Sequence, residues 1–228
     1  EGATSSPSPM LRKEFVVKNG VVSARAYVTA LGLYEMELNG KKVGDQVLTP
    51  GWTAYDKRVQ YQTYDIAPLL KPGANAVGVL LGDGWYSGSL GFSGQRGTYG
   101  KTPALLMQMR ILYRDGSTDW VVTDDSWACS IGPILANDIY HGESYDSRLE
   151  KKGWSAAGYP AKEWKPVRIK ATPPVALVAP QGPPIIKATE IKAVRAFKTP
   201  KGESVVDMGQ NMVGWVRMRV NGPAGTTV

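Results

Sequence analysis

Cysteine and histidine are almost absent from this sequence, which contains one of each among 228 residues. Cys129 has no partner for an internal disulfide, so cysteine usage gives no evidence of an oxidising compartment. It lies in the strand-like run DSWACSIG, where we expect a small buried side chain. A Cys/His metal cluster is excluded because it needs several such ligands. His141 lies in no recognisable nucleophile motif, so a Ser-His-Asp triad is not expected.

Long apolar runs and a clustered basic surface are also missing. No window reaches the roughly 18 apolar residues that a membrane helix needs, so membrane insertion is not expected. The net charge is +7, but lysine and arginine occur in ones and twos, as in LRK, KR and RIK. Because no basic stripe is interleaved with aromatic residues, nucleic acid is not an expected partner.

Alternation of apolar and polar residues is the dominant pattern of the chain, and a period of two is typical of strands with one buried face. No stretch of ten residues holds a 3.6-residue period, so we expect helix only as a turn near residues 66–70. We therefore predict an all-β fold, a jelly-roll β-sandwich. The predicted inward faces comprise Val22, Ala24, Ala26, Val28, Ala30, Tyr34, Met36, Leu38, Leu105, Met107, Met109, Ile111 and Tyr113. Tight turns are predicted at Asn19-Gly20, Asn39-Gly40, Asp83-Gly84, Asp115-Gly116 and Asn221-Gly222.

The composition divides the chain into four segments. Residues 1–9, EGATSSPSP, lack the basic start and apolar run of a signal peptide, so they are expected to be a linker or an end from which a signal peptide was removed. Residues 10–170 carry the jelly-roll pattern. Residues 171–184 contain five prolines and are expected to form a linker or a strap over the surface. Residues 185–228 are expected to be the truncated start of a second β-sandwich, with a strand at 212–220 that begins a hairpin and apolar surface left exposed.

Several long motifs of the chain resemble bacterial α-L-rhamnosidases. They include ARAYVTALGLYEMELNGKKVGDQVLTPGWTAYDKRVQYQTYDI, LGDGWYSGSLGF, DIYHGESYDSR and DMGQNMVGWVRMRV. The resemblance implies an enzyme with several β-sandwich domains around an (α/α)6 barrel, whose carboxylates hydrolyse terminal α-L-rhamnose by inversion. It further implies that this chain is an accessory region without the barrel, with a rhamnose-containing carbohydrate and the catalytic domain of the same polypeptide as partners. A periplasmic or extracellular parent is implied as well, and calcium is possible in the sugar-binding domain.

The stretch from Leu81 to Phe92, LGDGWYSGSLGF, offers the sharpest candidate binding residues. A sugar presents C–H faces that stack on aromatic rings and hydroxyls that need acceptors, and an aromatic beside a carboxylate supplies both. We expect a sugar site at Asp83, Gly84, Trp85 and Tyr86, with Trp52 and Asp56 from the loop PGWTAYDKR as a second wall. The alternative is that both loops are structural and that Trp85 caps the end of the sandwich.

A second candidate loop, IYHGESYDSR, contains Tyr140, Glu143 and Asp146. Two carboxylates across a cleft are the machinery of glycosidases, so a free-standing hydrolase that uses Glu143 and Asp146 is one hypothesis. A structural or interdomain role is the other. No loop has the acidic spacing of an EF-hand, so a calcium site would be assembled from separate loops. Its candidate donors are Asp45, Asp56, Asp83, Asp124, Asp125 and Asp138.

Overall fold

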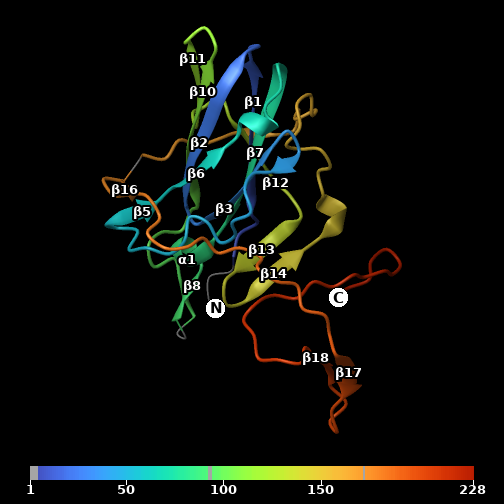
Figure 1. Ribbon diagram of the computed structural model, residues 1–228. Helices are drawn as coiled ribbons and strands as arrows, with labels where there is room; N and C mark the ends of the chain where they lie inside the picture. Colours follow the sequence, from blue (N-terminus) through green and yellow to red (C-terminus); the bar gives the residue numbers. More distant parts are fainter. Residues whose placement is uncertain (1–4, 92–93, 172) are drawn as a thin grey trace. The chain divides into compact units, whose positions relative to one another are not determined.

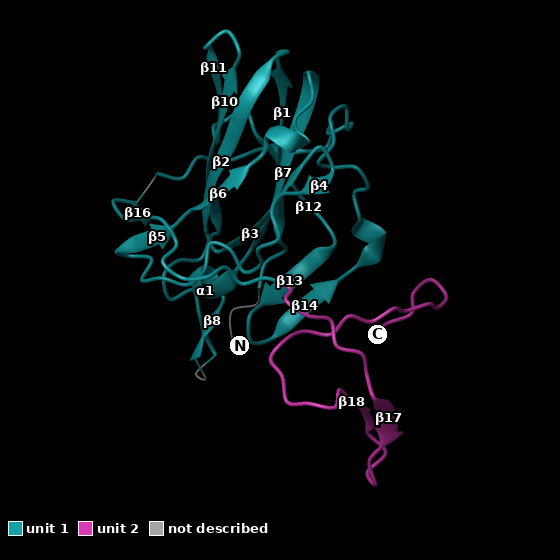
Figure 2. Cartoon of the chain, viewed as in Figure 1, with its two compact units in different colours: residues 1–186 teal, residues 187–228 magenta. Residues whose placement is uncertain are grey.

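A computed structural model describes residues 5–91, 94–171 and 173–228 (Figure 1). The chain forms two compact units, residues 1–186 and residues 187–228 (Figure 2). The expected tail segment lies partly outside the described residues, at positions 1–4, and so do Phe92 of the candidate loop and Thr172 of the proline-rich segment. None of the helices in the described part of the chain is long and apolar enough to cross a bilayer.

Two antiparallel sheets build the first unit. The larger sheet has the strand order β15 (Lys165–Pro166), β12 (Ala128–Ile131), β1 (Pro9–Val17), β7 (Gly73–Gly82), β3 (Leu33–Leu38) and β4 (Lys41–Lys42). The smaller sheet has the order β11 (Thr118–Val122), β10 (Ala104–Tyr113), β2 (Val21–Leu31) and β6 (Gln62–Asp65). Buried side chains from both sheets form one hydrophobic cluster, so the unit is a β-sandwich, as predicted.

The alternation read from the sequence predicts the buried faces with one exception. In β2, β3 and β10 the expected residues are buried or half-buried, but Val22 is 60% exposed. Leu112 of β10 pairs with Ser23 of β2 and the next residue, Tyr113, pairs with Val21, so a β-bulge leaves Val22 unpaired. The extra residue shifts the alternation by one position, which turns Val22 outward.

Cys129 is half-buried in β12 and not fully buried as expected. It pairs with Leu11 on one side and Lys165 on the other, and β15, which covers it there, is only two residues long. Because β15 is so short, it leaves the Cys129 thiol partly exposed.

Shorter elements close the ends of the sandwich. A 3-10 turn, η1 (Ala67–Leu69), lies where the sequence predicts one. The Asp83-Gly84 dipeptide does not form the expected tight turn between strands, because it begins the short helix α1 (Gly84–Ser87). The remaining elements of this unit are β8 (Ser89–Leu90) with β9 (Gln95–Arg96), β5 (Arg58–Gln60) with β16 (Ala176–Val178), β13 (Ile134–Asp138) with β14 (Gly142–Tyr145), and the 3-10 turn η3 (Ser147–Leu149).

The second unit contains the hairpin of β17 (Arg195–Lys198) and β18 (Ser204–Asp207). The strand predicted at residues 212–220 is not formed: this described segment has no regular secondary structure and its residues are exposed. An isolated strand has no ladder hydrogen bonds, so the alternating pattern alone does not produce one.

Candidate functional site

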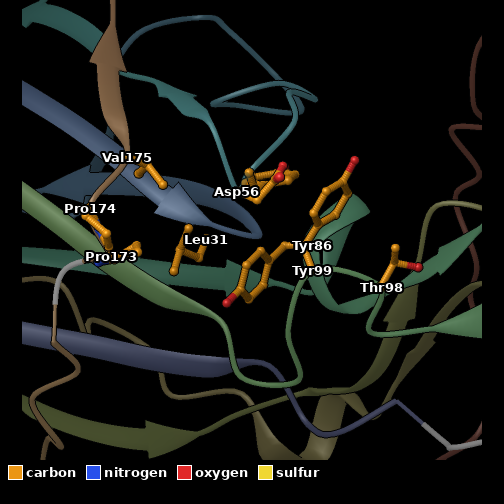
Figure 3. Close-up of a pocket in the computed structure, with 9 residues that line it drawn as sticks. Leu31, Asp56, Tyr86, Thr98, Tyr99, Pro173, Pro174 and Val175 are labelled. Carbon is orange, nitrogen blue, oxygen red and sulfur yellow. The ribbon is translucent and has the colours of Figure 1, made fainter.

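A cavity of about 490 Å³ lies beside α1 at the edge of the first unit (Figure 3). Its volume falls in the range of about 300–1,000 Å³ that is usual for small-molecule sites. The cavity is lined by Leu31, Tyr55, Asp56, Tyr86, Thr98, Tyr99, Pro173, Pro174 and Val175. Two of these, Asp56 and Tyr86, are among the binding residues expected from the sequence. The cavity therefore brings the two aromatic loops of the sequence together.

Three tyrosines form the floor of this cavity. The ring of Tyr55 lies edge-to-face against Tyr86 at 5.3 Å between centroids and tilted against Tyr99 at 5.1 Å. Burial, and then the neighbouring Tyr99, raises the pKa of Tyr55, so its phenol stays a neutral donor and donates to the carbonyl of Gly51 at 3.1 Å. Lys170 Nζ donates to the Tyr86 hydroxyl at 3.0 Å. These contacts fix the rings, while half-buried Tyr99 keeps part of its surface accessible.

Trp52 and Trp85 stack face to face next to this floor. Their ring centroids are 6.0 Å apart and their planes differ by 6°. Trp85 is half-buried and packs against the cluster of Tyr55 and Tyr86, whereas Trp52 is 52% exposed. The indole of Trp85 is thus neither a core plug nor a free surface ring. Of the two indole rings, that of Trp52 therefore presents the larger surface to solvent.

Asp83 faces the protein interior and not the cavity. Its carboxylate forms an ion pair with Arg96 and accepts hydrogen bonds from Ser5 Oγ at 2.8 Å and Ser87 Oγ at 3.1 Å. Arg96 also pairs with the buried carboxylate of Asp138. One guanidinium therefore bridges two carboxylates and ties α1, β9 and β13 together. A buried charge is stable only when it is paired in this way.

Gly84 allows α1 to pack closely against the start of β3. It has a φ of +52° and lies against Leu33, where an added Cβ would come within 2.7 Å of Leu33 Cγ. A side chain at this position would displace β3. The glycine is therefore required by the close approach of α1 to the sheet.

The candidate calcium donors of the sequence do not gather at one place in the described part of the chain. No group of three or more His, Cys, Asp or Glu is placed to hold a metal ion within the described part of the chain. Three of the candidate donors are already neutralised by basic side chains. Arg96 pairs with both Asp83 and Asp138, and Lys13 pairs with Asp124 at 2.7 Å. Calcium needs six to eight oxygens, whereas among the described residues Asp56 is the one carboxylate that lines the cavity.

The second candidate loop forms the hairpin β13–β14, away from the cavity lining. Arg148 donates from Nε and Nη2 to both oxygens of Asp146, and these hydrogen bonds lower the pKa of Asp146 to about 2. Burial, and then the charge of Glu35, raises the pKa of Glu143. Tyr140 is 49% exposed at the hairpin turn. The pKa values of the two carboxyls are thus shifted in opposite directions, and Asp146 is already paired with Arg148.

Several cavity residues escaped the sequence reasoning. Tyr99 and Thr98 lie in the stretch QRGTYG, where a single aromatic carries no periodic signal. Leu31 ends a strand and resembles any core residue. Pro173, Pro174 and Val175 belong to the proline-rich segment, which the sequence predicts to be either a linker or a strap over the surface.

Comparisons with known proteins match both units. The family model described as the alpha-L-rhamnosidase N-terminal domain matches residues 19–189, and the bacterial alpha-L-rhamnosidase concanavalin-like domain matches residues 197–228. An alpha-L-rhamnosidase from Streptomyces avermitilis is 45% identical over 226 residues, which are 98% of this chain and 22% of that protein. One from an Alteromonas species is 38% identical over 215 residues, 93% of this chain and 23% of that protein.

Solved structures give the same result. The native alpha-L-rhamnosidase of Aspergillus terreus superposes with a TM-score of 0.91 at 45% identity, covering 98% of this chain and 26% of that one. The Streptomyces avermitilis enzyme complexed with L-rhamnose gives 0.92 at 43% identity, covering 97% of this chain and 22% of that one. The chain thus spans about a quarter of the length of the relatives it matches.

Proposed function

The chain belongs to the alpha-L-rhamnosidase N-terminal domain family, and from this premise we propose that its first unit is an accessory carbohydrate-binding region. The parent enzyme would hydrolyse terminal α-L-rhamnose from glycans or glycosides by inversion, outside the cytosol. The observation that carries the proposal is the tyrosine-lined cavity with the exposed carboxylate of Asp56 at its edge. Rhamnose is the proposed ligand.

The cavity offers the two kinds of contact that a sugar requires. The accessible surface of Tyr99 would stack on the C–H face of the ring, as aromatic side chains do with apolar faces. Asp56 would accept hydrogen bonds from neighbouring hydroxyls, because a charged acceptor forms stronger hydrogen bonds than a neutral one. Its salt bridge to Lys57, at 3.4 Å between two exposed side chains, is weak enough to yield to a ligand.

The residues expected from LGDGWYSGSLGF take a supporting role in this proposal. Asp83 and Gly84 hold α1 in place, and Tyr86 fixes the cavity floor through Tyr55 and Lys170. Trp85 holds Trp52, whose exposed face would extend the aromatic surface beside the cavity.

A purely structural module is the second candidate, and one observation favours it. The hairpin β13–β14 and the turn η3 expose large side chains: Leu135, Ile139, Tyr140, Tyr145 and Leu149 are 36–51% exposed. Such a surface suits contact with another part of a longer polypeptide, including a catalytic domain. In that case the first unit would brace the enzyme and bind no sugar.

Titration with L-rhamnose, followed by tryptophan fluorescence, separates the two candidates. The unchanged chain is expected to bind, and Asp56→Asn is expected to weaken binding about tenfold, since a charge-assisted hydrogen bond contributes about 1.5 kcal/mol or more. Asp125→Asn is the matched control, because Asp125 is also exposed and lies outside the cavity lining. If no saturable binding is measured, the structural module is the remaining candidate. Runs in calcium and in EDTA show whether a metal takes part.

A further inference from the structure

The outer face of the smaller sheet carries a row of exposed side chains, one from each of its strands. The register pairs Arg110 of β10 with Trp120 of β11 on one side and with Arg25 of β2 on the other. Arg25 in turn pairs with Asp65 of β6. All of them are exposed, because the residues that alternate with them along the strands face the core. The strands lie side by side (Figure 1), and a spacing of about 4.8 Å makes the row roughly 14 Å long.

A second row, next to the first, is polar and aromatic. Gln108 of β10 pairs with Tyr27 of β2, and Tyr27 pairs with Thr63 of β6. Gln108 and Thr63 are exposed, and the half-buried ring of Tyr27 lies edge-to-face against Tyr61 at 6.4 Å between centroids. The two rows together therefore offer hydrogen-bonding groups and accessible aromatic rings on one flat surface.

The charges of the first row are not balanced. Arg25 and Arg110 lie directly opposite each other, and like charges in this arrangement destabilise a sheet. Among the described residues neither guanidinium forms an ion pair, and the carboxylate of Asp65 instead accepts a hydrogen bond from the N–H of Ala67 at 3.0 Å. Because arginine binds carboxylates through two parallel hydrogen bonds, this pair offers two unoccupied sites for anionic groups.

We propose that this face is a second binding surface, which takes an acidic polysaccharide whose sugars carry carboxylates. Arg25 and Arg110 bind carboxylates of the polymer, while Trp120, which is 53% exposed, stacks on the C–H face of a sugar ring. The row is longer than a single sugar ring, so it suits a chain. An acidic protein fits less well, because most of the exposed side chains on this face are polar, whereas the centre of a protein interface is apolar.

This surface is separate from the cavity beside α1. None of the residues of the two rows lines the cavity, and six positions of β2 separate Arg25 from Leu31 of the cavity lining, roughly 20 Å along a strand. The inference therefore does not depend on the proposed rhamnose site.

Two forms of one polymer that differ only in charge test the proposal. Polygalacturonate carries a carboxylate on each sugar, and its fully methylated ester carries none. In calorimetric titrations of the full chain at low ionic strength, we expect polygalacturonate to bind at least about tenfold more tightly than the ester. Excess L-rhamnose should not displace it. Equal affinities for the two polymers, or displacement by L-rhamnose, would overturn the proposal. Equally tight binding of poly-L-aspartate would overturn the choice of a polysaccharide over an acidic protein.

A matched set of substitutions separates a local site from the general attraction of a chain with a net charge of +7. Arg110→Gln and Arg25→Gln should each weaken the binding of polygalacturonate about tenfold, since each removes a charge-assisted contact. Arg168→Gln removes the same charge from an exposed position after β15 of the larger sheet and should leave the affinity nearly unchanged.

Thermal melting verifies the fold of all three variants. The melting temperature of Arg110→Gln should not fall, because the substitution relieves the repulsion between two arginines that face each other across the strands. Equal losses of affinity in Arg110→Gln and Arg168→Gln would assign the binding to net charge and overturn the proposal, as would unchanged binding in folded Arg110→Gln and Arg25→Gln proteins.

Discussion

Two carboxylates of the chain, Asp83 and Asp146, pair with arginines that differ in exposure to solvent. The side chains of Asp83 and Arg96 are 9% and 12% exposed, whereas those of Asp146 and Arg148 are 18% and 79% exposed. Removal of one partner from a buried pair leaves an uncompensated charge, while an exposed pair is screened by water. The same chemical change should therefore have very different effects at the two positions.

We expect Asp83→Asn to lower the free energy of unfolding by about 3–5 kcal/mol, because Arg96 loses one of its two carboxylates in a buried site. Asp146→Asn, the control, should cost much less, because Arg148 lies largely in solvent and water screens this pair. Urea denaturation at pH 7 measures both. Similar losses in the two variants would mean that burial does not control the strength of these pairs.

Trp85 should contribute to stability to an intermediate degree. It is half-buried and stacked on Trp52, so Trp85→Ala should cost about 1–3 kcal/mol, less than the roughly 3–5 kcal/mol of a fully buried tryptophan. Trp52→Ala should cost about 0.5 kcal/mol, since the ring is 52% exposed. The comparison uses urea midpoints. A loss of 4 kcal/mol or more for Trp85→Ala would make it a core residue.

At the scale of single residues, the sequence predicts which loops border the cavity better than it predicts the contacts of each side chain. The spacing of Asp83, Trp85 and Tyr86 marks a loop where aromatics meet a carboxylate, and that loop does border the cavity. The pairing of Asp83 with Arg96 is invisible in the sequence because it depends on how β8 and β9 fold back. Tyr99 is missed for the same reason, since only the folded loop brings it to Tyr55.

Among the elements, the proline-rich strap of residues 171–184 shows how a segment without periodicity can be held in one position. The alternation of β2, β3 and β10 is predictable because each strand has one face on the core. β16 has only three residues, and its position comes from parallel hydrogen bonds to β5. A distant backbone partner of this kind leaves no pattern in the sequence. The bulge at Val22 is unpredictable in the same way.

Truncation should reveal the contribution of the strap. A chain that ends at residue 186 keeps β16 and should retain the stability and the rhamnose affinity of the full chain. A chain that ends at residue 170 lacks β16 and three cavity residues, so it should melt lower and bind at least about tenfold more weakly. Differential scanning calorimetry and the fluorescence titration compare the two. Equal affinities would show that the strap is dispensable for binding.

The end of strand β13 should confer sensitivity to acid. Burial by itself would raise the pKa of Asp138, but hydrogen bonds from the backbone N–H groups of Ser89 and Tyr140, with the charge of Arg96, outweigh it and lower the pKa. A carboxylate with a lowered pKa in the folded state stabilises above its unfolded pKa of about 3.9, and this contribution is lost as the pH falls through the folded value.

Stability should therefore fall below about pH 4, and Asp138→Asn should be less stable at pH 7 but lose less between pH 4 and pH 3. Urea midpoints at pH 7, 4 and 3 test this expectation. Parallel losses in the two proteins over the acidic range would assign the acid sensitivity to other carboxylates, such as Asp124, whose pKa is also lowered.

At the scale of the whole molecule, the described chain consists of sandwich and hairpin, without the helical barrel that the family resemblance assigns to catalysis. A glycosidase needs one carboxyl that donates a proton and one that attacks or activates water. Glu143, with its raised pKa, suits the first role. Asp146 has a lowered pKa of about 2, which suits an ionised base, but Arg148 binds both of its oxygens. In this pair, therefore, no carboxylate is free to attack the sugar or to activate water.

We accordingly expect no hydrolysis of an aryl α-L-rhamnoside by this chain. The purified protein should release no more nitrophenol than a heat-inactivated control, at any pH between about 4 and 8 where glycosidase carboxyls act as acid and base. Glu143→Gln and Asp146→Asn are the informative variants, since a contaminating enzyme would be unaffected by either. Turnover that disappears in Glu143→Gln, in a protein that keeps its melting temperature, would instead make β14 a catalytic element. If the expectation holds, the raised pKa of Glu143 reflects only its surroundings, burial first and then the nearby charge of Glu35.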